Sequence, residues 1–219
     1  MITFKNVRDN TEINCLLKTA DKQLKILGYT EHSFRHVGLT ARNAGRILSE
    51  LRYNEREIEL ARIAGYLHDI GNAVNRVDHA HSGAIISYDI LIRMGMEPEE
   101  AAEIMLAIGQ HDENTGTAVS PIAAAIILAD KADVHRSRVY NRDILAFDIH
   151  DRVNYAVESS KILVSHESKT ATLDLIIDTE ICPVMDYFEI FIYRMNMCKK
   201  AAEFLGLTFH LIINQTHLL

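Results

Sequence analysis

The sequence predicts a mainly α-helical protein, with a helical bundle over residues 1–150 and a small α+β appendage over residues 151–219. Two observations lead to this expectation. Apolar residues recur at spacings of three and four from about residue 10 to residue 140, which is the period of helices. Beyond residue 150 the spacing changes to two in several short stretches, which is the period of strands. With 219 residues, the chain suits one large domain or one domain with an appendage.

The bundle is expected to contain several helices separated by short connections. Gly28 is typical of a helix end, and Asn54 is typical of an N-cap. Pro98 and Pro121 lie near helix starts, where the missing N–H matters little. The expected helices span about 10–28, 31–51, 54–69, 80–94, 97–108 and 121–137.

Residues 151–219 are expected to form a β-β-α-β unit. Apolar and polar residues alternate at 153–157, 173–177 and 207–213, and 161–165 is β-prone. A long helix with one apolar stripe lies between Pro183 and Gly206, so its flanking strands should be parallel with a right-handed crossover. The stripe either packs on the small sheet or forms a subunit interface.

The composition excludes several classes of protein. A net charge of −7 gives no electrostatic footprint for nucleic acid or an anionic membrane. The three cysteines form no C-x-x-C pair, which argues against a disulfide framework and a zinc ribbon. The apolar run from Ile122 to Ala129 is much shorter than the roughly 20 residues that span a bilayer. With no apolar leader at the N-terminus, we expect a cytoplasmic protein with no nucleic-acid or membrane partner.

The adjacent residues His68 and Asp69 close an apolar helix. Neighbours on a helix point about 100° apart, but they can converge on one ion where the helix unwinds, here at Ile70-Gly71. A hydrogen-bonded core pair is the alternative. His36 lies on the polar edge of the preceding helix, and Asp130 follows a strongly apolar run, which indicates a partner for its buried carboxylate.

The ordered set of His36, His68–Asp69 and Asp130 resembles the HD superfamily of metal-dependent phosphohydrolases, over roughly residues 20–140. The resemblance implies an HD-type all-α helical bundle in which these four residues bind a metal. His79, before Gly83-Ala84, and His111 resemble the residues that hold a second metal in some subfamilies. Asp69 would then bridge two ions. His81 is the alternative to His79, and a mononuclear site with nearby histidines is the alternative to the pair.

The sequence also departs from the family pattern. Asn72 stands where many HD enzymes have a lysine, so one cation near the substrate is expected to be missing. The loop after His111 lacks Gly-Tyr-Pro, which disfavours a cyclic-di-GMP phosphodiesterase. Arg136 and Arg138 either bind phosphate or pair with neighbours. His32 is expected to be a surface residue.

The resemblance implies a metal-dependent phosphohydrolase that attacks a nucleotide or other small phosphate ester with a metal-activated water. His/carboxylate ligands suit one or two divalent ions of Mn, Fe, Co, Ni or Zn. Asp69 would also orient the water, and Lys131 would neutralise developing negative charge. Phosphomonoesterase, phosphodiesterase and other metal chemistry, including oxygenation, stay open. The alternative is a non-catalytic nucleotide- or metal-binding regulatory module that forms a homodimer through its C-terminal unit.

Overall fold

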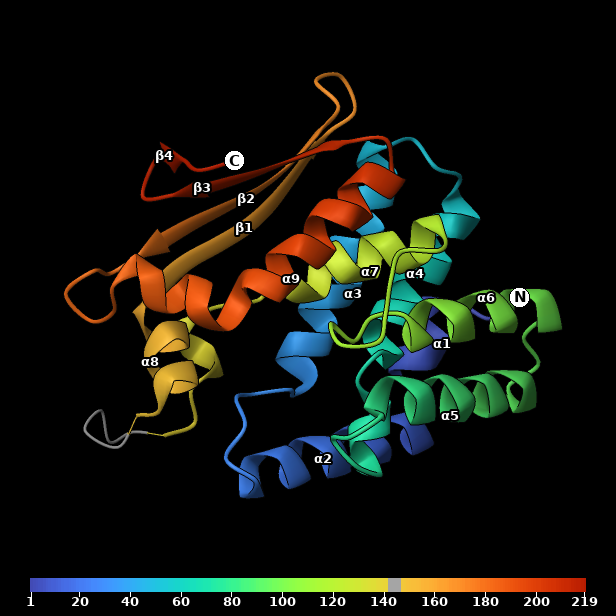
Figure 1. Ribbon diagram of the computed structural model, residues 1–219. Coiled ribbons are helices and arrows are strands. Elements are labelled where there is room, and N and C mark those ends of the chain that lie inside the picture. Colours follow the sequence, from blue (N-terminus) through green and yellow to red (C-terminus); the bar gives the residue numbers. More distant parts are fainter. Residues whose placement is uncertain (142–146) are drawn as a thin grey trace.

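A computed structural model describes residues 1–141 and 147–219 and shows a helical body covered on one side by a C-terminal sheet and helix (Figure 1). Short 3-10 turns follow two of the helices, η1 (Ile70–Ala73) after α4 and η2 (Arg136–Arg138) after α7. The helices of the body are α1 (Phe4–Arg8), α2 (Thr11–Ile26), α3 (Phe34–Glu50), α4 (Glu55–Leu67), α5 (His79–Arg93), α6 (Pro98–Gly109) and α7 (Pro121–Lys131). The predicted mainly helical class is confirmed.

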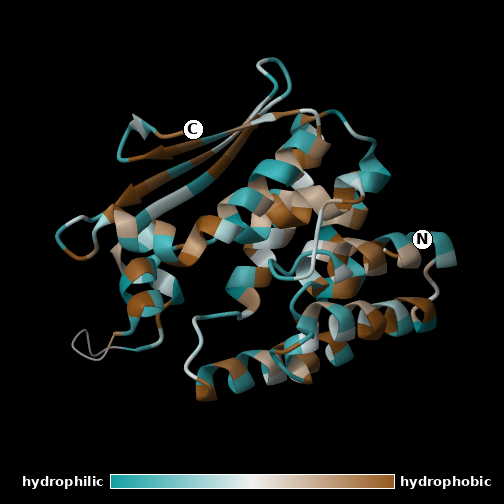
Figure 2. Ribbon diagram, viewed as in Figure 1, coloured by the Kyte–Doolittle hydropathy of each residue, from teal (hydrophilic) through white to brown (hydrophobic). Residues whose placement is uncertain are grey.

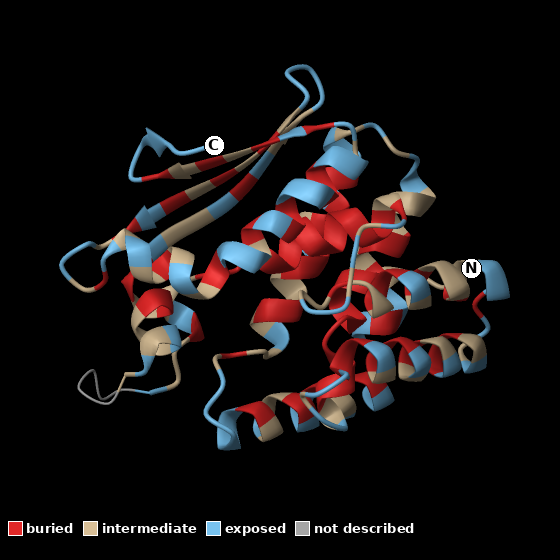
Figure 3. Cartoon of the chain, in the orientation of Figure 1, coloured by how far each residue is buried: buried red, intermediate tan, exposed pale blue. Residues whose placement is uncertain are grey.

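Helix α7 lies at the centre of the body and is buried on every side (Figure 3). The Ser120 side chain caps it by accepting from the N–H of Ala123, and Pro121 occupies its first turn. It packs against α3, α4, α6 and α9 (Val184–Phe204). Because its apolar surface is covered all round, the polar residues at its C-terminal end are also held in the interior.

The C-terminal part has a helix followed by a four-stranded mixed sheet. Strand β2 pairs antiparallel with β1 and parallel with β3, while β3 pairs antiparallel with β4. The elements are α8 (Ile149–Ala156), β1 (Val157–Ser165), β2 (Thr170–Ile177), β3 (Thr208–Ile213) and β4 (Thr216–His217), with α9 between β2 and β3. The predicted β-β-α-β order and the parallel pair around the long helix are confirmed.

Two local expectations were wrong, and two short elements were not expected. Residues 149–156 form α8 rather than a strand, because Val153 and Ala156 are buried three apart on one helical face and Asp148 caps the helix. The last helix of the body ends at Lys131, well before residue 137. The short elements α1 and β4 were not expected.

The apolar side of α9 joins the two parts of the chain. Hydrophobic and hydrophilic residues alternate along this helix (Figure 2), and its buried residues include Tyr187, Phe191 and Met195. Helix α9 packs mainly on α7 and also on β2 and β3. The bundle and the sheet therefore share one hydrophobic core. Among the described residues, no helix is both long and apolar enough to cross a bilayer.

Candidate metal centre

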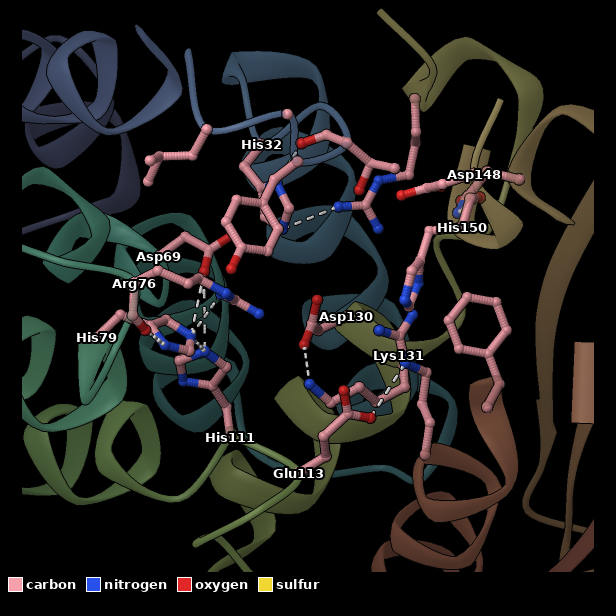
Figure 4. A pocket seen from close by; sticks show the side chains of 18 residues that line it. His32, Asp69, Arg76, His79, His111, Glu113, Asp130, Lys131, Asp148 and His150 are labelled. Atoms are coloured by element: carbon pink, nitrogen blue, oxygen red, sulfur yellow. Dashed lines mark hydrogen bonds and ion pairs between the residues drawn. The ribbon is translucent and has the colours of Figure 1, made fainter. Parts of the chain in front are cut away.

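The six residues predicted to bind metal lie together, because each comes from the end of a helix that points at the same place. Figure 4 shows four of them, Asp69, His79, His111 and Asp130. All six are buried, and all lie within one or two residues of a helix terminus or in a terminal turn. They are His36 in the first turn of α3, His68 and Asp69 after α4, His79 at the start of α5, His111 after α6, and Asp130 in the last turn of α7.

One group of four atoms comprises Nε2 of His36, Nε2 of His68, Oδ2 of Asp69 and Oδ1 of Asp130. The two ring nitrogens are 3.2 Å apart. Nε2 of His36 is 3.4 Å from Asp69 and 3.3 Å from Asp130. Nε2 of His68 is 3.4 Å from Asp69 and 3.6 Å from Asp130. Metal–ligand bonds of about 2.1 Å separate neighbouring ligand atoms by roughly 3.0–3.5 Å, so the spacing fits a single ion.

A second group lies on the other side of Asp69. Nε2 of His79 and Nε2 of His111 are 3.1 Å apart. They lie 3.7 and 3.8 Å from Oδ1 of Asp69, the oxygen that does not face the first pair. Asp69 therefore presents one oxygen to each histidine pair, which is the arrangement required of a bridging carboxylate.

The tautomer of each histidine follows from what its other nitrogen contacts. Nδ1 of His36 donates to Asp133 at 2.7 Å. The three other Nδ1 atoms donate to backbone carbonyls at 2.7–3.0 Å, which belong to Gly65 for His68, Arg76 for His79 and Ile108 for His111. In the neutral imidazoles, every Nε2 therefore carries its lone pair toward the centre.

The donor set fits a metal. Two lone pairs that face one another at 3.1–3.2 Å repel unless a cation or a proton lies between them. Oδ2 of Asp69 is buried without a hydrogen-bond partner among residues 1–141 and 147–219. A divalent ion in each group would satisfy these atoms, and four imidazoles with two carboxylates suit a transition metal.

The two histidine pairs differ in their electrostatics. Burial lowers the pKa of His36, but its contacts with three carboxylates raise it to about 10. Burial lowers the pKa of His68 in the same way, and the carboxylates of Asp69 and Asp130 raise it to about 9. Burial and the neighbouring positive charges lower the pKa of His111 to about 3, and burial also lowers the pKa of His79. Protons therefore compete with a metal at the first pair and hardly at the second.

Several neighbours orient the ligands. The Asn72 amide donates to Oδ1 of Asp69 at 2.8 Å and to its backbone carbonyl at 3.0 Å. Nζ of Lys131 lies 2.8 Å from Oδ2 of Asp130, which leaves Oδ1 to the histidines. Asp133 accepts from both His36 and Arg35. The sequence contains Asp133 three residues after Asp130, but nothing in the pattern distinguished it from a surface carboxylate.

A cavity of about 260 Å³ opens onto the centre, and sequence reasoning missed most of its wall. Arg76 lies four residues after Asn72 and donates to Nε2 of His79 at 3.1 Å. It supplies a cation in the region where one was expected to be missing, and it does so from the turn between η1 and α5, which no sequence pattern distinguished. Other lining residues that were not identified are Glu113, Asp148, His150, Asn154, Phe191 and Arg194.

Exposure and contacts distinguish the residues whose roles the sequence left open. His81 is exposed, whereas His79 is buried in the centre. Arg136 pairs with Glu158 away from the cavity. His32 lines the cavity, contrary to expectation, and its Nε2 accepts from Arg138 at 3.2 Å.

One protein family model and two similar proteins relate this chain to known proteins. The HD domain family model matches residues 29–136, a range that includes all six residues of the centre. An uncharacterised protein of Methanocaldococcus jannaschii is 27% identical, over 78% of this chain and 74% of its own length. A crystal structure of a predicted HD superfamily hydrolase from an uncultured Thermotogales bacterium is 28% identical, covers 57% of this chain and 67% of its own, and has a TM-score of 0.45. Residues 29–136 of this chain therefore form an HD domain.

Proposed function

We propose that this chain is a metal-dependent phosphohydrolase that acts on a small phosphate ester, such as a nucleotide, through a metal-activated water. One observation carries the proposal: two pairs of imidazole lone pairs converge on opposite oxygens of Asp69 at the floor of a cavity. The HD domain supports phosphate as the reacting group.

In this proposal two ions share the centre. His36, His68, Asp69 and Asp130 would hold the first, and His79, His111 and Asp69 the second. Bound there, a divalent transition metal (Mn, Fe, Co, Ni or Zn) lowers the pKa of a water and polarises a phosphoryl oxygen.

The side chains of the chain itself position the reactants. Asp69 lines the cavity and presents one oxygen to each histidine pair, so in this proposal it would also orient the attacking water. Lys131 and Arg76 line the same cavity and would stabilise the negative charge that develops on the phosphoryl group. Lys131 also holds Asp130 in place through their 2.8 Å ion pair.

The first experiment is metal analysis of protein purified without a chelator or a metal-affinity tag. We expect close to two equivalents of transition metal, and a loss of metal in the His68→Ala and Asp69→Ala variants. His81→Ala is the matched control, because His81 lies on the same helix as His79 but is exposed. The control should keep its full metal content.

Hydrolysis of p-nitrophenyl phosphate and of nucleotides is then measured with each metal added. Activity that disappears in Asp69→Ala but persists in His81→Ala would support the proposal. A wild-type protein that binds none of these metals would contradict it. Tight metal binding without turnover of any phosphate ester would instead favour the regulatory module.

A further inference from the structure

The cavity wall that lies opposite the second histidine pair comes from outside the HD domain. Asp148 and His150 face the cavity across from His79 and His111 (Figure 4). Helix α9 adds Phe191 and Arg194 to the lining. A substrate whose reacting phosphate lies at the metal centre would therefore touch the C-terminal unit with another part of its structure.

Two side chains contact Arg194 in this wall. Its Nε lies 3.4 Å from a carboxylate oxygen of Glu113. Its guanidinium carbon is 4.2 Å from the centre of the Phe191 ring, so the ring supports one face of the group. Only 17% of the side chain is exposed. The terminal nitrogens make no hydrogen bond with residues 1–141 or 147–219, so their donors are available to the cavity.

The other cations of the cavity each have at least one terminal nitrogen engaged. Lys131 pairs with Asp130, and Arg76 donates to His79 beside the metal centre. Every nitrogen of the Arg138 guanidinium donates to a backbone carbonyl, either that of Glu31 or that of Asp133. Arg194 differs from these residues because neither of its terminal nitrogens makes a hydrogen bond with residues 1–141 or 147–219, and it lies on the C-terminal side of the cavity.

We propose that Arg194 binds a second phosphate of the substrate, so that the enzyme prefers small molecules that carry at least two phosphate groups. This inference rests on the proposed function, because it assigns the first phosphate to the metal centre. A guanidinium with both terminal nitrogens free matches two oxygens of a phosphate. Because Phe191 and Glu113 fix the group before the substrate arrives, little side-chain entropy is lost on binding.

The test compares matched ligands that differ by one phosphate. Isothermal titration gives the Kd of AMP and ADP, and of fructose monophosphate and fructose bisphosphate, and steady-state assays give kcat/KM for the same compounds. We expect the wild type to favour the two-phosphate member of at least one pair by about tenfold or more, the size of one charge-assisted interaction. Arg194→Gln should reduce that ratio toward unity, and Arg194→Lys should keep part of it.

Two further variants separate recognition from a structural role. Arg152→Gln breaks a comparable ion pair, 2.9 Å from Asp186, away from the cavity, and should keep the wild-type ratio. Glu113→Gln removes the partner of Arg194 but not its charge, so it should lower the ratio less than Arg194→Gln does. If Glu113→Gln lowers the ratio as much as Arg194→Gln does, Arg194 acts only by holding the Glu113 loop.

The inference would be overturned if the wild type showed no preference in either pair, or if Arg194→Gln kept the preference while its melting temperature matched the wild type. Failure of the proposed function would give another result, namely no bound metal or no turnover of any phosphate ester. The ratio of Kd values for the paired ligands reports on Arg194 and requires no turnover.

Discussion

The two groups of the candidate metal centre, around His36 and His68 and around His79 and His111, differ in the charge that surrounds them. His36 and His68 face Asp130, and Asp133 holds the far nitrogen of His36. The second pair faces Oδ1 of Asp69 alone, and one of its nitrogens already accepts a hydrogen bond from a guanidinium. More negative charge surrounds the first group, so we expect the first group to bind its ion more tightly.

Removing Arg76 should strengthen the second group. The lone pair on Nε2 of His79 cannot accept from Nη1 of Arg76, 3.1 Å away, and bind a metal at the same time. In Arg76→Ala the affinity for the second equivalent of metal should therefore rise by about tenfold, the size of one lost hydrogen bond to a charged group. Titration of Mn²⁺ or Zn²⁺ against a competing chelator measures this. Arg42→Ala, at an exposed position of α3, is the control. An unchanged or weaker affinity for the second equivalent of metal would show that Arg76 does not compete with the metal for Nε2 of His79.

At the scale of helices and strands, much of the site could be predicted because its residues lie at helix ends. Caps and apolar periodicity indicated where α4 stops, and the apolar run before Asp130 indicated that this carboxylate is buried, although α7 was expected to continue to residue 137. The structure brings the polar residues at these two helix ends together. Helix α8 was missed because an alternation of Val153, Tyr155 and Val157 is compatible with a strand, whereas burial of Ala156 decides for a helix. The contribution of Arg194 depends on α9 packing on α7, a long-range contact that no local pattern encodes.

The contact between η1 and the start of α5 sets the position of His79 relative to Asp69. A Cβ on Gly71 would lie 2.0 Å from the carbonyl oxygen of His79 and 2.5 Å from the amide nitrogen of Gly83. Both atoms are backbone, so Gly71→Ala must push the two elements apart. We expect a loss of about 1–3 kcal/mol in the free energy of unfolding, as for overpacking, and weaker binding of the second metal.

Gly38→Ala is the matched control for Gly71→Ala. Gly38 lies in α3, and a Cβ there meets nothing within 4 Å. Alanine in a helix interior should therefore stabilise the protein by roughly 0.5–1 kcal/mol. Urea unfolding in the presence of a chelator gives both values. Equal stability of the two variants would show that η1 and α5 can move apart at little cost in free energy.

At the scale of the whole molecule, the candidate metal centre brings together residues from five consecutive helices, α3 to α7. The C-terminal sheet and α9 share their core with this bundle, and they complete the wall of the same cavity. The boundary near residue 150 stays a prediction, and so does a homodimer through the C-terminal unit. An ion that binds the folded centre and not the unfolded chain stabilises all of these segments at once.

Metal should therefore raise the melting temperature, and more so at alkaline pH. At a metal concentration of about 100 times Kd, binding adds ~2.7 kcal/mol to the free energy of unfolding, which corresponds to a rise in melting temperature of roughly 5–10 °C for a chain of this length.

The raised pKa values of His36 and His68, about 10 and 9, mean that protonation stabilises the metal-free protein fully below the unfolded pKa of about 6.5. That stabilisation is lost as the pH rises through 9–10, while competition between protons and metal also falls. Thermal unfolding with Mn²⁺ and with a chelator, at pH 6.5 and 9, should thus show the larger difference at pH 9. His36→Ala should reduce the dependence of this metal-induced shift on pH, and His81→Ala should keep it. A larger shift at pH 6.5 than at pH 9 would show that the first pair is not protonated.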